Sequence, residues 1–184
     1  MKKLLLFIFL LPSICYSQAY FNGVAASFQT LGIGGTSGNY TAGRLYIIFT
    51  GCSNAGGTPA TMTVTGTGQT WTQIASTLNN SGNRRITAFR YAPSSNNTNQ
   101  TDVNYTGVQD GGFILIVEVT NVIATGTNGA DAIIQSVTNS ANGTNPSITL
   151  AAIGRNNSVI SMFINETNPP SATIETDWTN VTQS

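Results

Sequence analysis

The run Leu45-Tyr46-Ile47-Ile48-Phe49-Thr50 decides the fold class of this chain. Successive side chains of a β-strand point to opposite faces of the sheet. Because five consecutive residues of this run are apolar, both of its faces would be buried. This pattern is typical of a central strand in a packed sheet, and we predict such a strand at residues 45–50.

Further strand-like runs follow along the chain, separated by Gly, Asn, Ser and Pro. In residues 61–65, Met62 and Val64 alternate with three threonines, which predicts apolar side chains inside and threonine outside. No window shows helical periodicity. The glycine-rich residues 32–43 are expected to form a loop. Other strands are predicted at residues 24–29, 70–74, 85–91, 102–106, 113–119, 132–137, 147–151, 159–164 and 172–176.

The spacing of these runs, about ten residues per strand, is typical of β-sandwiches. We therefore predict an all-β fold, an antiparallel two-sheet β-sandwich resembling a jelly roll. Residues 18–184 have a length that suits one such domain. The run Trp178-Thr179-Asn180-Val181 is typical of the start of another strand, so we expect the chain to be truncated at its C-terminus and to lack one or two strands.

Residues 1–17 have the pattern of a secretory signal peptide. Lys2 and Lys3 precede an apolar run at residues 4–11, which is too short to span a bilayer. Cys15-Tyr16-Ser17 then gives a small-x-small site, so we predict cleavage before Gln18. The mature protein would be secreted or held at the cell surface, without a transmembrane segment. A lipid anchor on Cys15 is a lesser alternative, because the preceding isoleucine is bulky where a small residue is expected.

Charge and cysteine content limit the partners of the mature chain. Charged residues are 8% of the sequence, against ~25% in an average soluble domain. Basic residues are too sparse for a phosphate-binding patch, which argues against nucleic acid as a partner. Only Cys52 remains after signal cleavage, so an intramolecular disulfide cannot form. This cysteine is either a small core residue at a strand end or half of an intermolecular disulfide.

Most classes of enzyme require side chains that this sequence lacks. It contains no histidine, and both lysines precede Gln18, which excludes histidine-based triads, histidine-ligated zinc and a lysine Schiff base. No nucleotide-binding loop or serine-hydrolase motif occurs. Carboxylate chemistry remains, and a polysaccharide hydrolase would need two carboxyl groups across a cleft. The candidates for these carboxyl groups are Glu118 or the pair Glu175 and Asp177. A hydrogen-bonded structural role is the simpler interpretation of Glu118.

Two kinds of binding site are compatible with the remaining residues. Calcium, a possible structural cofactor, binds oxygen ligands, and its candidate ligands are Asp102, Asp110 and Asp131. Glycan binding on β-sandwiches uses exposed aromatic rings with polar neighbours. Tyr40 and Tyr105 lie near polar loops and are expected to be exposed, whereas Trp71 also fits a core position. The candidate glycan-binding residues are Tyr40, Tyr105, Asn104, Trp71 and Arg90.

The order of several motifs resembles a lectin-like, jelly-roll β-sandwich domain of bacterial surface proteins and phage tail proteins. The motifs are the strand at 45–50, the run Gly68-Gln69-Thr70-Trp71-Thr72-Gln73-Ile74, Phe89-Arg90-Tyr91, the run 115–122, Asn157-Ser158-Val159-Ile160, and Pro169-Pro170 ahead of Trp178. The resemblance covers most of the mature chain and implies adhesive, glycan-binding or structural roles. It supplies no catalytic residue.

Three functions follow as expectations. The first is a secreted or cell-surface, non-enzymatic module that binds a glycan-type ligand. The second is a structural or assembly subunit of an envelope or fibre, joined through edge strands or Cys52. The third is a polysaccharide hydrolase that uses Glu118 or the pair Glu175 and Asp177. Fold alone does not choose among them.

Overall fold

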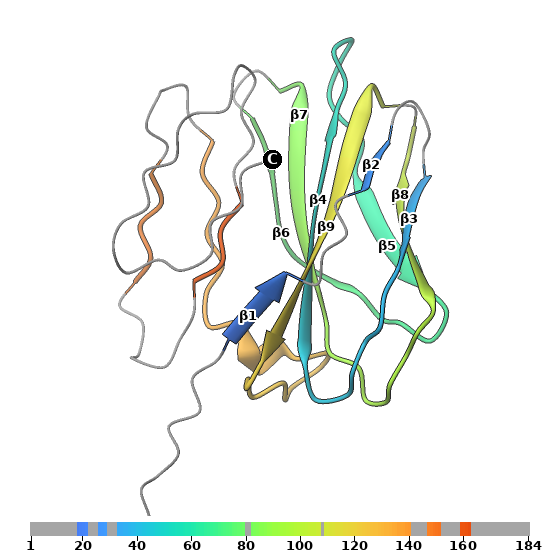
Figure 1. The fold of residues 1–184 in the computed structure, drawn as a ribbon. Coiled ribbons are helices and arrows are strands. Elements are labelled where there is room, and N and C mark those ends of the chain that lie inside the picture. The colour runs from blue at the N-terminus through green and yellow to red at the C-terminus, as the bar shows by residue number, and fades with distance from the viewer. Residues whose placement is uncertain are drawn as a thin grey trace, which may run out of the picture.

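A computed structural model of the chain describes residues 18–21, 26–28, 33–79, 82–107, 109–140, 147–151 and 159–162. These residues form two antiparallel sheets that pack face to face (Figure 1). The all-β, two-sheet antiparallel sandwich predicted from the sequence is confirmed. The predicted signal peptide at residues 1–17 and the run 178–181 lie outside the described residues. No helix in the described part has the length and apolar character needed to span a bilayer.

The larger sheet is built around the apolar run at residues 45–50, which lies in β4. Its strand order is β1 (Gln18–Phe21), β9 (Gly111–Thr120), β4 (Leu45–Ser53), β7 (Arg84–Tyr91) and β6 (Thr72–Leu78), with β2 (Ala26–Phe28) also paired to β9. Ile48 in β4 lies opposite Phe89 on one side and Ile116 on the other. The strand is thus central, as predicted.

The smaller sheet has the order β3 (Ile33–Ser37), β8 (Gln100–Tyr105) and β5 (Met62–Gly66). The prediction of a loop over residues 32–43 is wrong for the part that forms β3. Gly35 lies opposite Asp102, and a Cβ atom at this position would collide with the side chains of Gln100 and Asp102. Glycine here permits close approach of the strand to its neighbour, which is one of the uses of glycine inside a strand.

Two apolar clusters account for the apolar residues on both faces of β4. The first fills the space between the sheets and comprises Tyr40, Tyr46, Ile48, Cys52, Met62, Val64, Phe89, Tyr91, Val103, Tyr105, Ile114 and Ile116. The second lies on the opposite face of the larger sheet, around Leu45, Ile47, Val117 and Val119. Ile133 and Ile160, which follow the sheet in the sequence, pack against this second cluster.

The later strands predicted from the sequence are not observed in the described residues. Residues 130–132 form a short 3₁₀ helix, η1 (Ala130–Ala132), and residues 133–140, 147–151 and 159–162 belong to no strand. Two of these segments are connected by a side chain instead of by backbone pairing. The side-chain amide of Gln135 forms two hydrogen bonds with the backbone of Ala151, each 3.0 Å long. The apolar residues that led to these strand predictions include Ile133 and Ile160, which pack against the second cluster instead of forming strands. The predicted strand at residues 172–176 lies outside the described residues.

Candidate binding pocket

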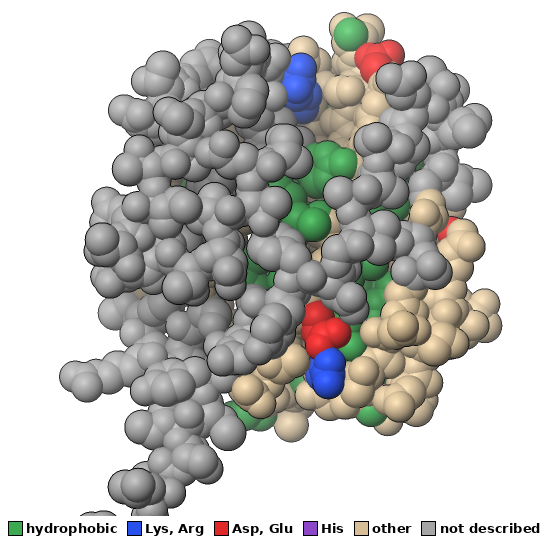
Figure 2. Space-filling model, viewed as in Figure 1, with side chains coloured by type: hydrophobic (Ala, Val, Ile, Leu, Met, Phe, Trp, Pro, Cys, Tyr) green, Lys and Arg blue, Asp and Glu red, His purple; other side chains and the backbone are tan. Residues whose placement is uncertain are grey.

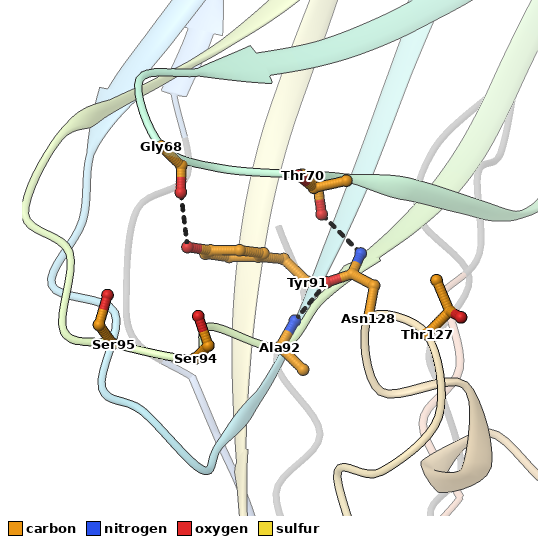
Figure 3. Close-up of a pocket in the computed structure, with 8 residues that line it drawn as sticks. All are labelled: Gly68, Thr70, Tyr91, Ala92, Ser94, Ser95, Thr127 and Asn128. Atoms are coloured by element: carbon orange, nitrogen blue, oxygen red, sulfur yellow. Dashed lines mark hydrogen bonds between the residues drawn. The ribbon is translucent and has the colours of Figure 1, made fainter.

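A hollow of about 320 Å³ lies at the end of β7 where three loops meet (Figure 3). The turn before β6 contributes Gly68 and Thr70. The second loop follows β7, whose last residue is Tyr91, and it contributes residues 92, 94 and 95. The third loop contributes residues 127 and 128. The lining residues are Gly68, Thr70, Tyr91, Ala92, Ser94, Ser95, Thr127 and Asn128.

Asn128 holds the three loops together. Its side-chain Nδ2 donates to the carbonyl oxygens of Thr70 at 2.5 Å and Arg90 at 3.0 Å, and to Thr72 Oγ1 at 3.1 Å. Its Oδ1 accepts from the backbone N–H of Ala92 at 2.9 Å. The residue has φ 54°, a left-handed conformation that asparagine tolerates better than most residues. One amide group thus fixes the loop before η1 to both β6 and β7.

Tyr91 lies at the base of the pocket, where its side chain is only 5% exposed and belongs to the cluster between the sheets. Its hydroxyl donates to the carbonyl of Gly68 at 3.3 Å, and its ring lies 5.0 Å from that of Trp71 between centroids. Burial raises the pKa of Tyr91 above its ordinary value of 10.0, so the phenol remains a hydrogen-bond donor at neutral pH. Figure 3 shows its ring extending across the hollow toward Gly68.

The remaining lining groups are small, polar and uncharged. Ser94, Ser95 and Thr127 are exposed hydroxyl residues, and Figure 3 shows the hydroxyls of Ser94 and Ser95 on the side of the chain that faces the hollow. None of the eight lining residues bears a charge. A hydroxyl group both donates and accepts hydrogen bonds. The pocket therefore matches a neutral ligand rich in hydroxyl groups better than an ion.

The prediction that Tyr40 and Tyr105 are exposed is wrong. Tyr40 is 2% exposed and Tyr105 is 7% exposed. Each buried phenol has a threonine partner in the core: Tyr40 Oη lies 2.5 Å from Thr101 Oγ1, and Tyr105 Oη lies 3.1 Å from Thr50 Oγ1. Because these partners satisfy the polar ends, the rings can be buried fully. Neither residue lines the pocket at the end of β7.

The other candidate residues are divided between two places. Trp71 is half-buried against the core, with its Nε1 donating to Gln69 Oε1 at 2.8 Å, and its ring supports Tyr91. The Nε atom of Arg90 donates to the Asn128 carbonyl at 3.2 Å. These two residues therefore lie beside the pocket. Asn104 lies on the smaller sheet, where its Nδ2 donates to Thr65 Oγ1 at 2.9 Å.

The three candidate calcium ligands are not brought together. Asp102 accepts a hydrogen bond from Gln100 Nε2 at 2.5 Å, and Asp131 accepts one from Thr125 Oγ1 at 2.9 Å. The carboxylate of Asp110 accepts a hydrogen bond from the backbone N–H of Ala55. Within the described ranges, no three His, Cys, Asp or Glu residues form a group that could hold a metal ion.

Glu118 has a structural partner. It faces the same side of β9 as Ile114 and Ile116 and forms an ion pair with Arg44. Glu118 is only 8% exposed. On the face shown in Figure 2, the described charged side chains are scattered rather than gathered into a patch. Glu175 and Asp177 lie outside the described residues.

Cys52 is a buried core residue, which confirms the first of its two interpretations. It is 3% exposed and belongs to the cluster between the sheets. Burial raises the pKa of its thiol from 9.0 to about 11, although the nearby charge of Arg85 acts in the opposite direction. The native thiol is therefore protonated at neutral pH and is a poor nucleophile.

This burial predicts a loss of stability at alkaline pH. The unfolded chain releases the thiol proton at a lower pH than the folded chain, so stability is fully present below about pH 9 and falls as the pH rises toward 11. We expect the thiol alone to contribute a loss of about 2–3 kcal/mol over this window. Buried tyrosines such as Tyr105, whose pKa is also raised by burial, add to the loss above their ordinary pKa of 10.0.

The measurement is urea unfolding of the wild type and of Cys52→Ala at neutral pH and at several pH values through this window. The variant should be less stable at neutral pH but should lose less stability between pH 9 and pH 11. Parallel pH profiles for the two proteins would show that the thiol is not responsible.

Comparison of the chain with protein-family models, curated proteins and solved structures finds no match. The functional assignment therefore depends on the pocket and on the sequence.

Proposed function

We propose that this protein is a secreted or cell-surface, non-enzymatic β-sandwich module that binds neutral glycans in the pocket at the end of β7. The observation that carries the proposal is the lining itself: the exposed, uncharged hydroxyl residues Ser94, Ser95 and Thr127, in a hollow whose loops are held by Asn128. Such a lining suits a sugar, because each sugar hydroxyl can exchange hydrogen bonds with protein hydroxyl groups.

The size and rigidity of the pocket support a small ligand. Its volume of about 320 Å³ lies near the lower limit of the ~300–1,000 Å³ typical of ligand sites. A single sugar unit or the end of a glycan chain suits such a site better than a long polymer. Since the four hydrogen bonds of the Asn128 side chain hold the loops in place, little ordering would be needed when a ligand binds.

The extracellular location is supported by the N-terminal sequence. The basic, apolar and small-residue pattern of residues 1–17 is that of a secretory signal. Strand β1 begins at Gln18, the first residue of the predicted mature chain, and pairs with β9. Predicted cleavage before this residue would therefore keep every described residue of the sheet.

A glycan array tests the proposal. We expect the wild type to bind a subset of neutral glycans and Ser94→Trp to bind them at least tenfold more weakly, because indole at this exposed position fills the hollow; a tenfold loss corresponds to about 1.4 kcal/mol. Ser136→Trp is the matched control, since Ser136 is exposed and is not one of the lining residues.

Two outcomes would contradict the proposal. One is a wild type that binds no glycan either with calcium or after its removal. The other is equal binding by Ser94→Trp and the wild type. Thermal unfolding of each variant confirms that differences in binding do not result from loss of the fold.

A further inference from the structure

Strand β5 forms one end of the smaller sheet, and it pairs only with β8 among the described strands. We propose that β5 of one molecule pairs antiparallel with β5 of a second copy, which joins two three-stranded sheets into one six-stranded sheet. Strands at a sheet edge present backbone N–H and C=O groups that can pair with another chain. The pairing would be isologous, as in most symmetric dimers.

The sequence of β5 lacks the devices that protect sheet edges. Natural edges carry charges, prolines or bulges that block pairing. Residues 61–67 include no charged residue and no proline. The threonines and the valine in this run favour strand structure. By contrast, β6, which ends the larger sheet, has a bulge between Gln73 and Ala75. The seven-residue run has the low charge and high β-propensity of self-associating segments.

The alternation of buried and exposed residues makes β5 complementary to itself. Met62 and Val64 are buried, while Thr63 and Thr65 are exposed. A twofold axis through Val64 would place Thr63 of one copy opposite Thr65 of the other, so uncharged threonines would meet on the outer face. The apolar side chains would remain on the core side in both copies, because antiparallel partners keep the same face.

Charge repulsion between the two copies would be small. Within the described strands of the smaller sheet the only acid is Asp102, which lies opposite Thr65 on β8. Three strand spacings of about 4.8 Å would separate the two β8 strands, and the register would shift the two Asp102 residues by two positions along the strands, so they would lie roughly 16 Å apart. This distance exceeds the screening length of ~8–10 Å at physiological ionic strength. A second copy of this chain therefore meets no electrostatic barrier at β5.

The test is light scattering coupled to size-exclusion chromatography over a range of concentrations of the secreted protein. We expect a mass of two chains at high concentration for the wild type and of one chain for the double variant Thr63→Lys with Thr65→Lys, which sets like charges against each other at the junction. The matched control is Thr138→Lys with Thr149→Lys, two exposed threonines outside the sheets, which should leave the dimer intact.

A wild type that remains monomeric at every concentration would overturn the proposal. A dimer that survives Thr63→Lys with Thr65→Lys, or one that is lost equally in the control, would also overturn it. If the β5 variant does not fold, hydrogen exchange of the wild type decides the question. Amides of β5 should then become more protected as the protein concentration rises, and protection that does not change would contradict the pairing.

Discussion

Replacing Ile48 with alanine is expected to lower the free energy of unfolding by about 4 kcal/mol, near the upper end of the ~2–5 kcal/mol typical of buried Ile→Ala changes. Ile48 is 0% exposed and lies between paired residues of β7 and β9. Because both neighbouring strands are fixed by their own ladders, the surroundings cannot collapse into the cavity. A loss of this size is a large fraction of the ~5–15 kcal/mol that stabilises a typical protein.

The matched control for this substitution is Ile123→Ala. Ile123 is 75% exposed, and its replacement should change stability by no more than about 0.5 kcal/mol. Urea unfolding followed by tryptophan fluorescence measures both variants. Equal losses for Ile48→Ala and Ile123→Ala would contradict the assignment of β4 as the centre of the sandwich.

Replacing Asn128 with alanine is expected to destabilise the protein by about 3 kcal/mol and to abolish glycan binding. The substitution removes the two amide N–H donors, which are shared among three acceptors, and the Oδ1 acceptor; each of these three groups is worth about 1 ± 0.5 kcal/mol. It also places a Cβ-bearing residue without a local hydrogen bond at φ 54°, where the left-handed conformation costs roughly 1–2 kcal/mol. The total is reduced because water replaces some of the lost partners.

Two further variants separate the contributions of conformation and hydrogen bonding. Asn128→Gly restores the backbone preference but not the hydrogen bonds, so it should recover only about 1 kcal/mol and leave the binding defect. Asn121, which is exposed and also has positive φ (57°), provides the control. Asn121→Ala should cost about 1 kcal/mol and leave binding unchanged. Full recovery of stability and binding in Asn128→Gly would show that the amide does not hold the pocket together.

The sequence predicts the strands of the sandwich because their local patterns agree with their burial. The continuous apolar run of β4 and the alternation of Met62 and Val64 in β5 are signals that do not depend on distant residues. Strand β3 was missed because its glycines have no burial pattern. The position of Gly35 becomes meaningful only when the side chains of Gln100 and Asp102 are placed opposite it.

The site could be predicted only in part. An aromatic and polar binding surface was expected, but Tyr40 and Tyr105 are buried because threonines on other strands satisfy their hydroxyl groups. The pocket joins Gly68, Tyr91 and Asn128, which are far apart in the sequence, and its geometry depends on how the strands are ordered. The Asn128-Gly129 dipeptide was the available signal, since Asn-Gly marks positive φ in turns.

The most direct test of the proposal that the pocket binds glycans is an NMR titration of the ¹⁵N-labelled wild type. Methyl glycosides of glucose, galactose, mannose and N-acetylglucosamine serve as the neutral probes. For at least one probe, we predict saturable shifts at millimolar concentration in the amides of Gly68, Tyr91, Ser94, Ser95 and Asn128, and their loss in Ser94→Trp. Saturable shifts confined to another surface, or no shift with any probe, would contradict the account.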